Sequence, residues 1–144
     1  MATVTHVIDG KHVEESDRSG SVYVPATGAV QHDVPYASRA QVDEAIAAAA
    51  AALPGWAATS LTKRTDVLFR LRALLTDRRD DIAAVVTSEH GKVLSDAAGE
   101  VARGIDNVEF AAGLTSHLKG DFSQQVSSGI DVHSIKQPVG VVGC

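Results

Sequence analysis

The last six residues of the chain, 139–144, read Val-Gly-Val-Val-Gly-Cys and form an apolar run that only glycine interrupts. Such runs are typical of a buried strand in a sheet that is covered on both faces. Chain termini normally lie at the surface and carry polar, weakly ordered residues. We therefore expect residues 139–144 to be the start of a core strand in a truncated chain, the front portion of a larger protein.

The composition is that of a soluble globular protein and argues against several classes of partner. The 144 residues suit one domain or a large part of one, and 44% are hydrophobic although only 4% are aromatic. The net charge of -5 is spread along the chain, without a basic stripe for nucleic acid or a polybasic cluster for anionic lipid. No apolar stretch approaches the roughly 20 residues that cross a bilayer. We expect neither a nucleic acid nor a membrane as a partner.

The cytoplasm is the expected compartment. Residues 1–6 lack the charged start and the continuous apolar run of a secretory signal. The single cysteine, Cys144, precludes an internal disulfide, which suits a reducing environment.

The first forty residues carry strand and turn signals. Asp9-Gly10 lies between two short apolar segments and favours the positive φ angles of a type I′ turn, so residues 6–13 predict a hairpin. A polar loop, a strand, a Pro-Ala-Thr-Gly turn and a second strand are expected next, at 17–21, 22–24, 25–28 and 30–35.

Helical periodicity follows. Ser38 and Gln41 have the spacing of a capping box, and the helix that they begin has an apolar face of Val42, Ile46, Ala49, Leu53 and Trp56. Pro54-Gly55 is expected to end or bend this helix.

A second helical region covers about 61–90, and its pattern leaves open whether it breaks near residues 76–77. Gly91 suits the position after its last turn. Its expected inward residues are Leu68, Leu71, Leu75, Ile82, Val85 and Val86. A third helix is expected to begin with Ser95 as its cap, to end before 113–120, and to turn inward Val101, Ile105, Val108 and Ala112.

Strand periodicity returns at residue 121. Residues 122–126 and 130–137, joined by Ser-Ser-Gly at 127–129, predict a long hairpin. Ile130 and Val132 alternate with polar residues, so one face of this ribbon is expected to be covered.

Neither a metal site nor a nucleophile is predicted. The six histidines form no i, i+4 pair and have no second type of ligand at metal spacing. Cys144 has no following helix whose N-terminus would activate it, so its expected role is that of a small buried filler. Gly140 and Gly143 resemble half of a phosphate-cradling loop, but no helix follows them.

Arg103 is the candidate binding residue, and two interpretations of it stay open. It lies on the third helix opposite Val101 and Ile105, with Glu100 and Asp106 three residues away on either side. In one interpretation these charges form a solvated ion-pair ladder. In the other, the planar guanidinium binds a ligand carboxylate through two parallel N–H bonds, a geometry that suits guanidinium better than ammonium. Gly99 and Gly104 weaken the same helix, as expected if something packs closely there.

Several motifs together resemble the front of the aldehyde dehydrogenase superfamily. They are Pro-Ala-Thr-Gly at 25–28, Trp56, Arg64, Glu-His-Gly-Lys at 89–92 and Gln-Pro-Val-Gly-Val-Val at 137–142. The stretches 88–92, 99–101 and 103–109 resemble its coenzyme-A-acylating methylmalonate-semialdehyde dehydrogenase branch. Val24 departs from the superfamily, which usually has Asn before the Pro-Ala-Thr-Gly turn.

The resemblance implies an α/β fold: an incomplete aldehyde-dehydrogenase-like NAD-binding domain. Residues 1–120 would be the N-terminal part of the cofactor domain, 121–138 an oligomerisation-type hairpin, and 139–144 the start of a core strand. The full enzyme would use NAD and coenzyme A to convert methylmalonate or malonate semialdehyde to propionyl- or acetyl-CoA with loss of CO2, as in valine breakdown. Arg103 would bind the substrate carboxylate.

The same resemblance implies that this chain alone is inactive. The family's nucleophilic cysteine lies far beyond the position of Cys144, so the chain supplies no catalytic, cofactor-binding or metal-binding residue. NAD and coenzyme A are not expected to bind it by itself, and the semialdehyde only in the full enzyme, which is expected to be a homo-oligomer. Two alternatives stay open: a non-catalytic oligomerisation or interaction module, and a truncated product without a function of its own.

Overall fold

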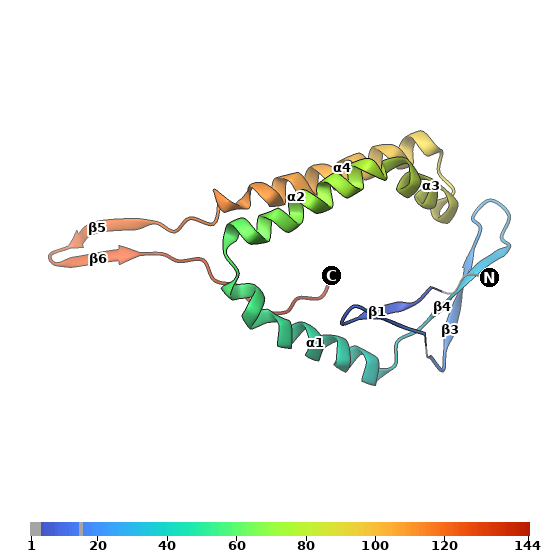
Figure 1. The fold of residues 1–144 in the computed structure, drawn as a ribbon, viewed down its shortest axis with the longest axis horizontal. Helices are drawn as coiled ribbons and strands as arrows, with labels where there is room; N and C mark the ends of the chain where they lie inside the picture. The colour runs from blue at the N-terminus through green and yellow to red at the C-terminus, as the bar shows by residue number, and fades with distance from the viewer. Residues whose placement is uncertain (1–3, 15) are drawn as a thin grey trace.

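The computed structural model describes residues 4–14 and 16–144, and it combines antiparallel hairpins with helices (Figure 1). The strands are β1 His6–Ile8, β2 Lys11–Val13, β3 Ser19–Tyr23, β4 Val30–Pro35, β5 Phe122–Ser127 and β6 Ile130–His133. The helices are α1 Arg39–Ala58, α2 Leu61–Asp77, α3 Arg79–His90, α4 Leu94–Ala112 and the short 3-10 turn η1 Gly113–Thr115. The absence of a secretory signal was expected over residues 1–6, of which 1–3 lie outside the described residues.

The two N-terminal hairpins follow the turn signals of the sequence. β1 and β2 are joined by Asp9 (φ 49°) and Gly10 (φ 73°), the positive angles that a type I′ turn needs. β3 pairs with β4 and begins at Ser19, so the loop expected over 17–21 is too long. Tyr36 donates its backbone N–H to Arg18 O at 2.8 Å, which extends this ladder into the expected loop. Pairing with β4 therefore outweighs the polar composition of this segment.

Helix α1 begins where the capping box predicts. The Gln41 backbone N–H donates to Ser38 Oγ (3.2 Å), and the Ser38 N–H donates to Gln41 Oε1 (2.7 Å). The helix was expected to end or bend at Pro54-Gly55; it does not end there, because it continues to Ala58. Its alanine-rich flank favours helix strongly enough to carry it for another turn. Its apolar face is uncovered: no α1 residue is buried, and Ile46 is 53% exposed.

The region expected over 61–90 is two helices, which break at Arg78. Gly91 ends α3 in the left-handed conformation (φ 84°) and donates its N–H to Thr87 O at 2.8 Å, as its position predicts. The Ser95 cap is wrong: the N-cap of α4 is Val93, two residues earlier, and the helix begins at Leu94. The carbonyl of Val93 accepts the N–H groups of Asp96 and Ala97 (3.1 and 3.2 Å), so Ser95 lies inside the first turn.

Helix α4 is the centre of the small core. Both α2 and α3 pack against it (Figure 1), and Ala97, Ile105 and Ala112 are buried. The predicted inward stripe of α4 is confirmed, since Val101 and Val108 are half-buried between these residues. Of the six inward residues expected on α2 and α3, Leu71 (41% exposed) and Val85 (60% exposed) face solvent. The other four, Leu68, Leu75, Ile82 and Val86, are half-buried.

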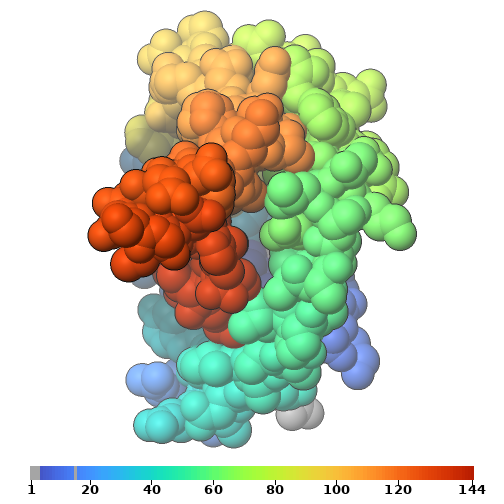
Figure 2. Space-filling model, turned by 90° about the vertical axis from the view of Figure 1, so that its left-hand side faces the viewer, coloured from blue at the N-terminus to red at the C-terminus, as the bar shows by residue number. Residues whose placement is uncertain are grey.

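The β5–β6 hairpin stands away from the helices (Figure 1), and Figure 2 shows it (dark orange) projecting toward the viewer. Every residue of both strands is exposed, so the covered face expected for Ile130 and Val132 is not formed by this chain. β6 ends at His133 rather than at 137, and Gln125 (φ 57°) lies where the register shifts.

Residues 139–144 form no strand, so the predicted core strand is not present in this structure. Val139 is 95% exposed, and Cys144 is an exposed free thiol rather than a buried filler. The physical reason is the missing partner: a strand needs neighbouring backbone to pair with, and all pairing among the described residues is within local hairpins.

The surface area shows that the chain does not bury its own apolar faces. Its accessible surface is 10,756 Å², whereas a folded monomer of 15.0 kDa has about 7,000 Å². Within residues 4–14 and 16–144, no single helix is long and apolar enough to cross a membrane. The pair α1 and α2, bent by 117°, meets that test only jointly, by length and composition.

Candidate functional site

Arg103 lies on the face of α4 that points away from α2 and α3. Its side chain is exposed, because the neighbours on the buried face are Val101 and Ile105, each two residues away. Among the described residues its guanidinium forms no ion pair, and Asn107 Nδ2 donates only to its backbone carbonyl (2.8 Å). The ion-pair ladder with Glu100 and Asp106 is therefore not formed. Its role in binding stays a prediction.

Lys92, just before α4, forms an ion pair with Glu100, the acidic neighbour of Arg103. Lys92 Nζ lies 2.6 Å from Glu100 Oε1, and the lysine side chain is only 17% exposed against 45% for the glutamate. Lys92 belongs to the short connection 91–93 between α3 and α4. The connection before α4 therefore supplies the lysine that pairs with Glu100 on that helix.

The charges around Glu100 favour its ionised form. The hydrogen bond from Lys92 lowers the pKa of Glu100 below its usual value, and the positive charges of Lys92, Arg103 and His90 act in the same direction. Desolvation opposes this shift without reversing it. Glu100 is thus an anion at neutral pH, near Lys92 of the connection 91–93 and Arg103 of α4.

The two glycines of α4 have different surroundings. A side chain at Gly99 would come within 3.9 Å of Arg103 Nη1, which is ordinary van der Waals contact, and one at Gly104 would meet nothing within 4 Å. The close packing expected at these glycines is therefore absent from the described part of the chain. The open space at Gly104 lies on the same exposed face as Arg103.

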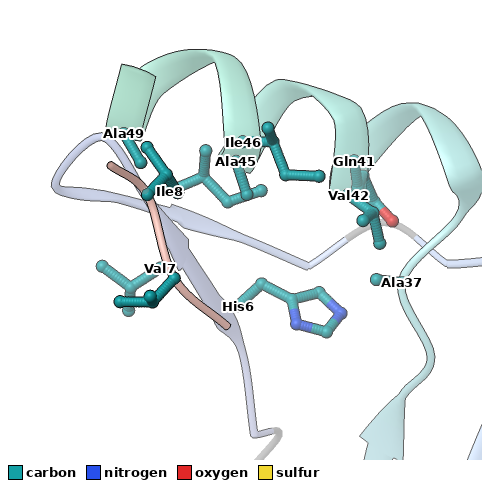
Figure 3. A pocket seen from close by; sticks show the side chains of 11 residues that line it. His6, Val7, Ile8, Ala37, Gln41, Val42, Ala45, Ile46 and Ala49 are labelled. Carbon is teal, nitrogen blue, oxygen red and sulfur yellow. The ribbon is translucent and has the colours of Figure 1, made fainter. Parts of the chain in front are cut away.

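An apolar cavity of about 360 Å³ lies between α1, β1 and the C-terminal run. Figure 3 shows Val42, Ile46 and Ala49 of α1 and His6 and Ile8 of β1 around it. Val141 and Val142 complete the lining. The cavity brings residues 139–144 beside the uncovered face of α1, so it belongs to the incomplete core rather than to a polar binding site.

The other candidate groups do not converge. Among the described residues no three His, Cys, Asp or Glu side chains gather to hold a metal ion. The described residues also do not fit a dinucleotide. No parallel sheet is formed by them, and side chains at Gly140 and Gly143 would meet nothing within 4 Å, so these glycines cradle no group.

Sequence reasoning identified Arg103 but missed Lys92. The i, i+3 spacing pointed from Arg103 to Glu100, while Lys92 lies eight residues before Glu100 and approaches it through the turn at 91–93. The only available signal was a lysine directly after the helix-ending glycine.

Comparison with known proteins gives a consistent result along the chain. Residues 12–144 match the model of the aldehyde dehydrogenase family. Malonate-semialdehyde dehydrogenase from Pseudomonas aeruginosa is 44% identical over 142 residues, which cover 99% of this chain and 29% of that protein.

Solved structures show the same similarity. Methylmalonate-semialdehyde dehydrogenase from Oceanimonas doudoroffii matches with a TM-score of 0.91 and 44% identity, over 96% of this chain and 28% of that one. A protein assigned as methylmalonate-semialdehyde dehydrogenase from Sinorhizobium meliloti 1021, complexed with NAD, matches with a TM-score of 0.92 and 40% identity, over 97% of this chain and 29% of that one. The chain thus spans less than a third of the length of these relatives.

Proposed function

This chain belongs to the aldehyde dehydrogenase family, and we propose that it is the N-terminal portion of an NAD-dependent, coenzyme-A-acylating methylmalonate- or malonate-semialdehyde dehydrogenase. The observation that carries the proposal is the match at 44% identity over 142 residues to a malonate-semialdehyde dehydrogenase, together with a TM-score of 0.91 to a methylmalonate-semialdehyde dehydrogenase. Both relatives are named for substrates that bear a carboxylate.

The surface of the chain supports its being part of a larger domain. Its accessible area exceeds that of a folded monomer by several thousand Å², the size of an obligate interface. The exposed residues include the apolar face of α1 and the valines of the C-terminal run. A parallel sheet laid along α1 and continued from residues 139–144 would cover both.

In the proposed reaction, the full enzyme oxidises the semialdehyde, releases CO2 and passes the acyl group to coenzyme A. NAD would supply the hydride acceptor when bound, and the described residues form no parallel sheet that would cradle it. The proposed role of this chain in the reaction is to recognise the carboxylate of the substrate through Arg103. Arg103 presents a guanidinium that forms no ion pair with any described residue, and its planar fork matches a carboxylate better than an ammonium group does.

A chimeric enzyme tests this proposal. In it, the present chain replaces the matching 142 residues of the Pseudomonas aeruginosa relative. We expect coenzyme-A-dependent NADH formation from malonate or methylmalonate semialdehyde, with acetyl- or propionyl-CoA as the product identified by mass spectrometry. The parent enzyme is the positive control. A folded chimera that oxidises propionaldehyde but neither semialdehyde would refute the substrate assignment.

The β5–β6 hairpin supports a second proposal, that of a subunit contact in a homo-oligomer. Both strands are exposed along their whole length, and Phe122, Val126, Ile130 and Val132 are each at least half exposed. Unpaired strand edges with apolar side chains favour pairing with another chain. Light scattering of the chimera with and without residues 122–133 tests this, and an unchanged oligomer would refute it.

A further inference from the structure

Glu100 occupies the position from which a carboxylate normally neutralises an arginine on the same helix. It precedes Arg103 by three residues, and side chains three apart on a helix are neighbours that pair when their charges are opposite. An arginine held in this way must break that pair before it can bind a ligand carboxylate.

The structure shows Glu100 turned to a different cation. Its Oε1 lies 2.6 Å from Lys92 Nζ, whereas the Arg103 guanidinium forms no ion pair with any described residue. Lys92 is the more covered partner, with a side-chain exposure of 17% against 45% for Glu100. Arg103 Nη1 instead lies on the side of Gly99, 3.9 Å from where a Cβ on that glycine would be, which is ordinary van der Waals contact.

We propose that Lys92 is a positioning residue: by holding Glu100, it leaves the Arg103 guanidinium unpaired for the substrate carboxylate. The inference rests on the proposed function, since it concerns recognition by Arg103. It adds a role for a residue that contacts neither the substrate nor Arg103. The preference for carboxylate-bearing aldehydes then depends on a residue outside the binding site.

The test compares two aldehydes in the chimeric enzyme. Lys92→Met keeps most of the apolar stem and removes the charge, so Glu100 is released to pair with Arg103. We expect kcat/KM for methylmalonate semialdehyde, relative to propionaldehyde, to fall about fivefold, the upper range for an exposed ion pair, and mainly through KM. The double variant Lys92→Met/Glu100→Gln lacks the carboxylate that the loss of Lys92 releases, while Asp106 is unchanged in both variants, so its ratio should return to that of the parent chimera.

A purely structural role gives the opposite pattern. If the Lys92–Glu100 pair only stabilised the turn, the double variant would be as impaired as the single one, and the inference would be overturned. Should Lys92→Met fail to fold, Glu100→Gln alone decides, because the inference requires its substrate ratio to be unchanged or higher. Arg39→Met is the matched control, as it removes the exposed Arg39–Asp43 pair on α1 (3.2 Å) and should leave the ratio unchanged.

Arg103→Ala distinguishes failure of substrate recognition by Arg103 from failure of the positioning role of Lys92. If this variant keeps the full preference for the semialdehyde, recognition by Arg103 is wrong and the proposed role of this chain fails. If Arg103→Ala abolishes the preference while Lys92→Met leaves it intact, only the positioning role of Lys92 fails.

Discussion

Pro25 lies against Gly91, so that the turn between β3 and β4 meets the residue that ends α3. A Cβ built on Gly91 would lie 3.1 Å from Pro25 Cβ, and the φ of Gly91 is +84°. His32 on β4 approaches Glu89 on α3 in the same region, with 3.8 Å between Nε2 and Oε1. These contacts join the β3–β4 hairpin to the C-terminal end of α3.

Gly91→Ala is expected to destabilise the protein by about 1–2 kcal/mol, because an L-residue in the left-handed region is strained and because Pro25 must yield space. Gly104→Ala is the matched control: that glycine lies inside α4 in open space, and alanine there should stabilise by about 0.5–1 kcal/mol. Thermal melting of the chimeric enzyme measures both. Shifts of the same sign would contradict the account.

The Lys92–Glu100 pair should make stability depend on acid. Since the pKa of Glu100 is lowered in the folded protein, the pair stabilises it fully above the unfolded value of about 4.5. This contribution is lost as the pH falls through the lower folded value. Unfolding midpoints of the chimera and of its Glu100→Gln variant should therefore converge in acid and differ at neutral pH. A constant difference at all pH values would show that the charge of Glu100 is irrelevant.

The isolated chain of 144 residues is expected to have no dehydrogenase activity and no saturable affinity for NAD. No described residue group forms a dinucleotide cradle, and Cys144 is an exposed thiol at the end of an unpaired run. The measurement is NADH absorbance after addition of methylmalonate semialdehyde and coenzyme A, with the chimera as positive control. NADH formation above a protein-free blank would overturn the prediction.

We also expect the isolated chain to self-associate. Ile46 and Trp56 of α1 and Phe110 of α4 are each about half exposed or more, and apolar patches beyond a few hundred Å² promote association. Sedimentation velocity over a range of concentrations should show species larger than 15.0 kDa. A single monomeric species with a sharp, cooperative melt would contradict this expectation.

Arg103→Ala in the chimera should lower kcat/KM for methylmalonate semialdehyde by roughly 30-fold or more, and much less for propionaldehyde. The reason is that only the semialdehyde carries the carboxylate that the guanidinium binds. Arg103→Lys should restore part of the loss, because an ammonium cannot grip both oxygens in one plane. Equal losses for the two aldehydes would assign Arg103 to helix stability.

Local signals in the sequence predicted local structure well. The capping box of Ser38 and Gln41, the Asp9-Gly10 turn and the inward stripe of α4 each depend on residues within one or two turns, and all three are confirmed. The expected Ser95 cap is wrong because the Val93 carbonyl already accepts the first helical N–H groups. The preference of serine for N-cap positions could not show at which residue after the turn at 91–93 the helix would begin.

Long-range features were less predictable. The run at 139–144 has the composition of a core strand, but strand formation depends on backbone pairing, and the run pairs with no strand among the described residues. At the candidate site, the place of Arg103 on the helix left two interpretations open, and its binding of a carboxylate, which the family resemblance implies, stays a prediction. The ion pair of its neighbour Glu100 with Lys92 could not be predicted, because Lys92 lies in the turn before α4 and helical periodicity does not describe that turn.

Every strand in the described chain pairs with the strand next to it in sequence, and α2, α3 and α4 pack among themselves. Such local contacts close quickly, because little loop entropy is lost. On the ribosome, this segment would acquire its hairpins and its helical cluster as it emerges, before any later part of a longer polypeptide is made. Its apolar faces would then be exposed during synthesis, when a chaperone that binds α1 would have the most effect on yield.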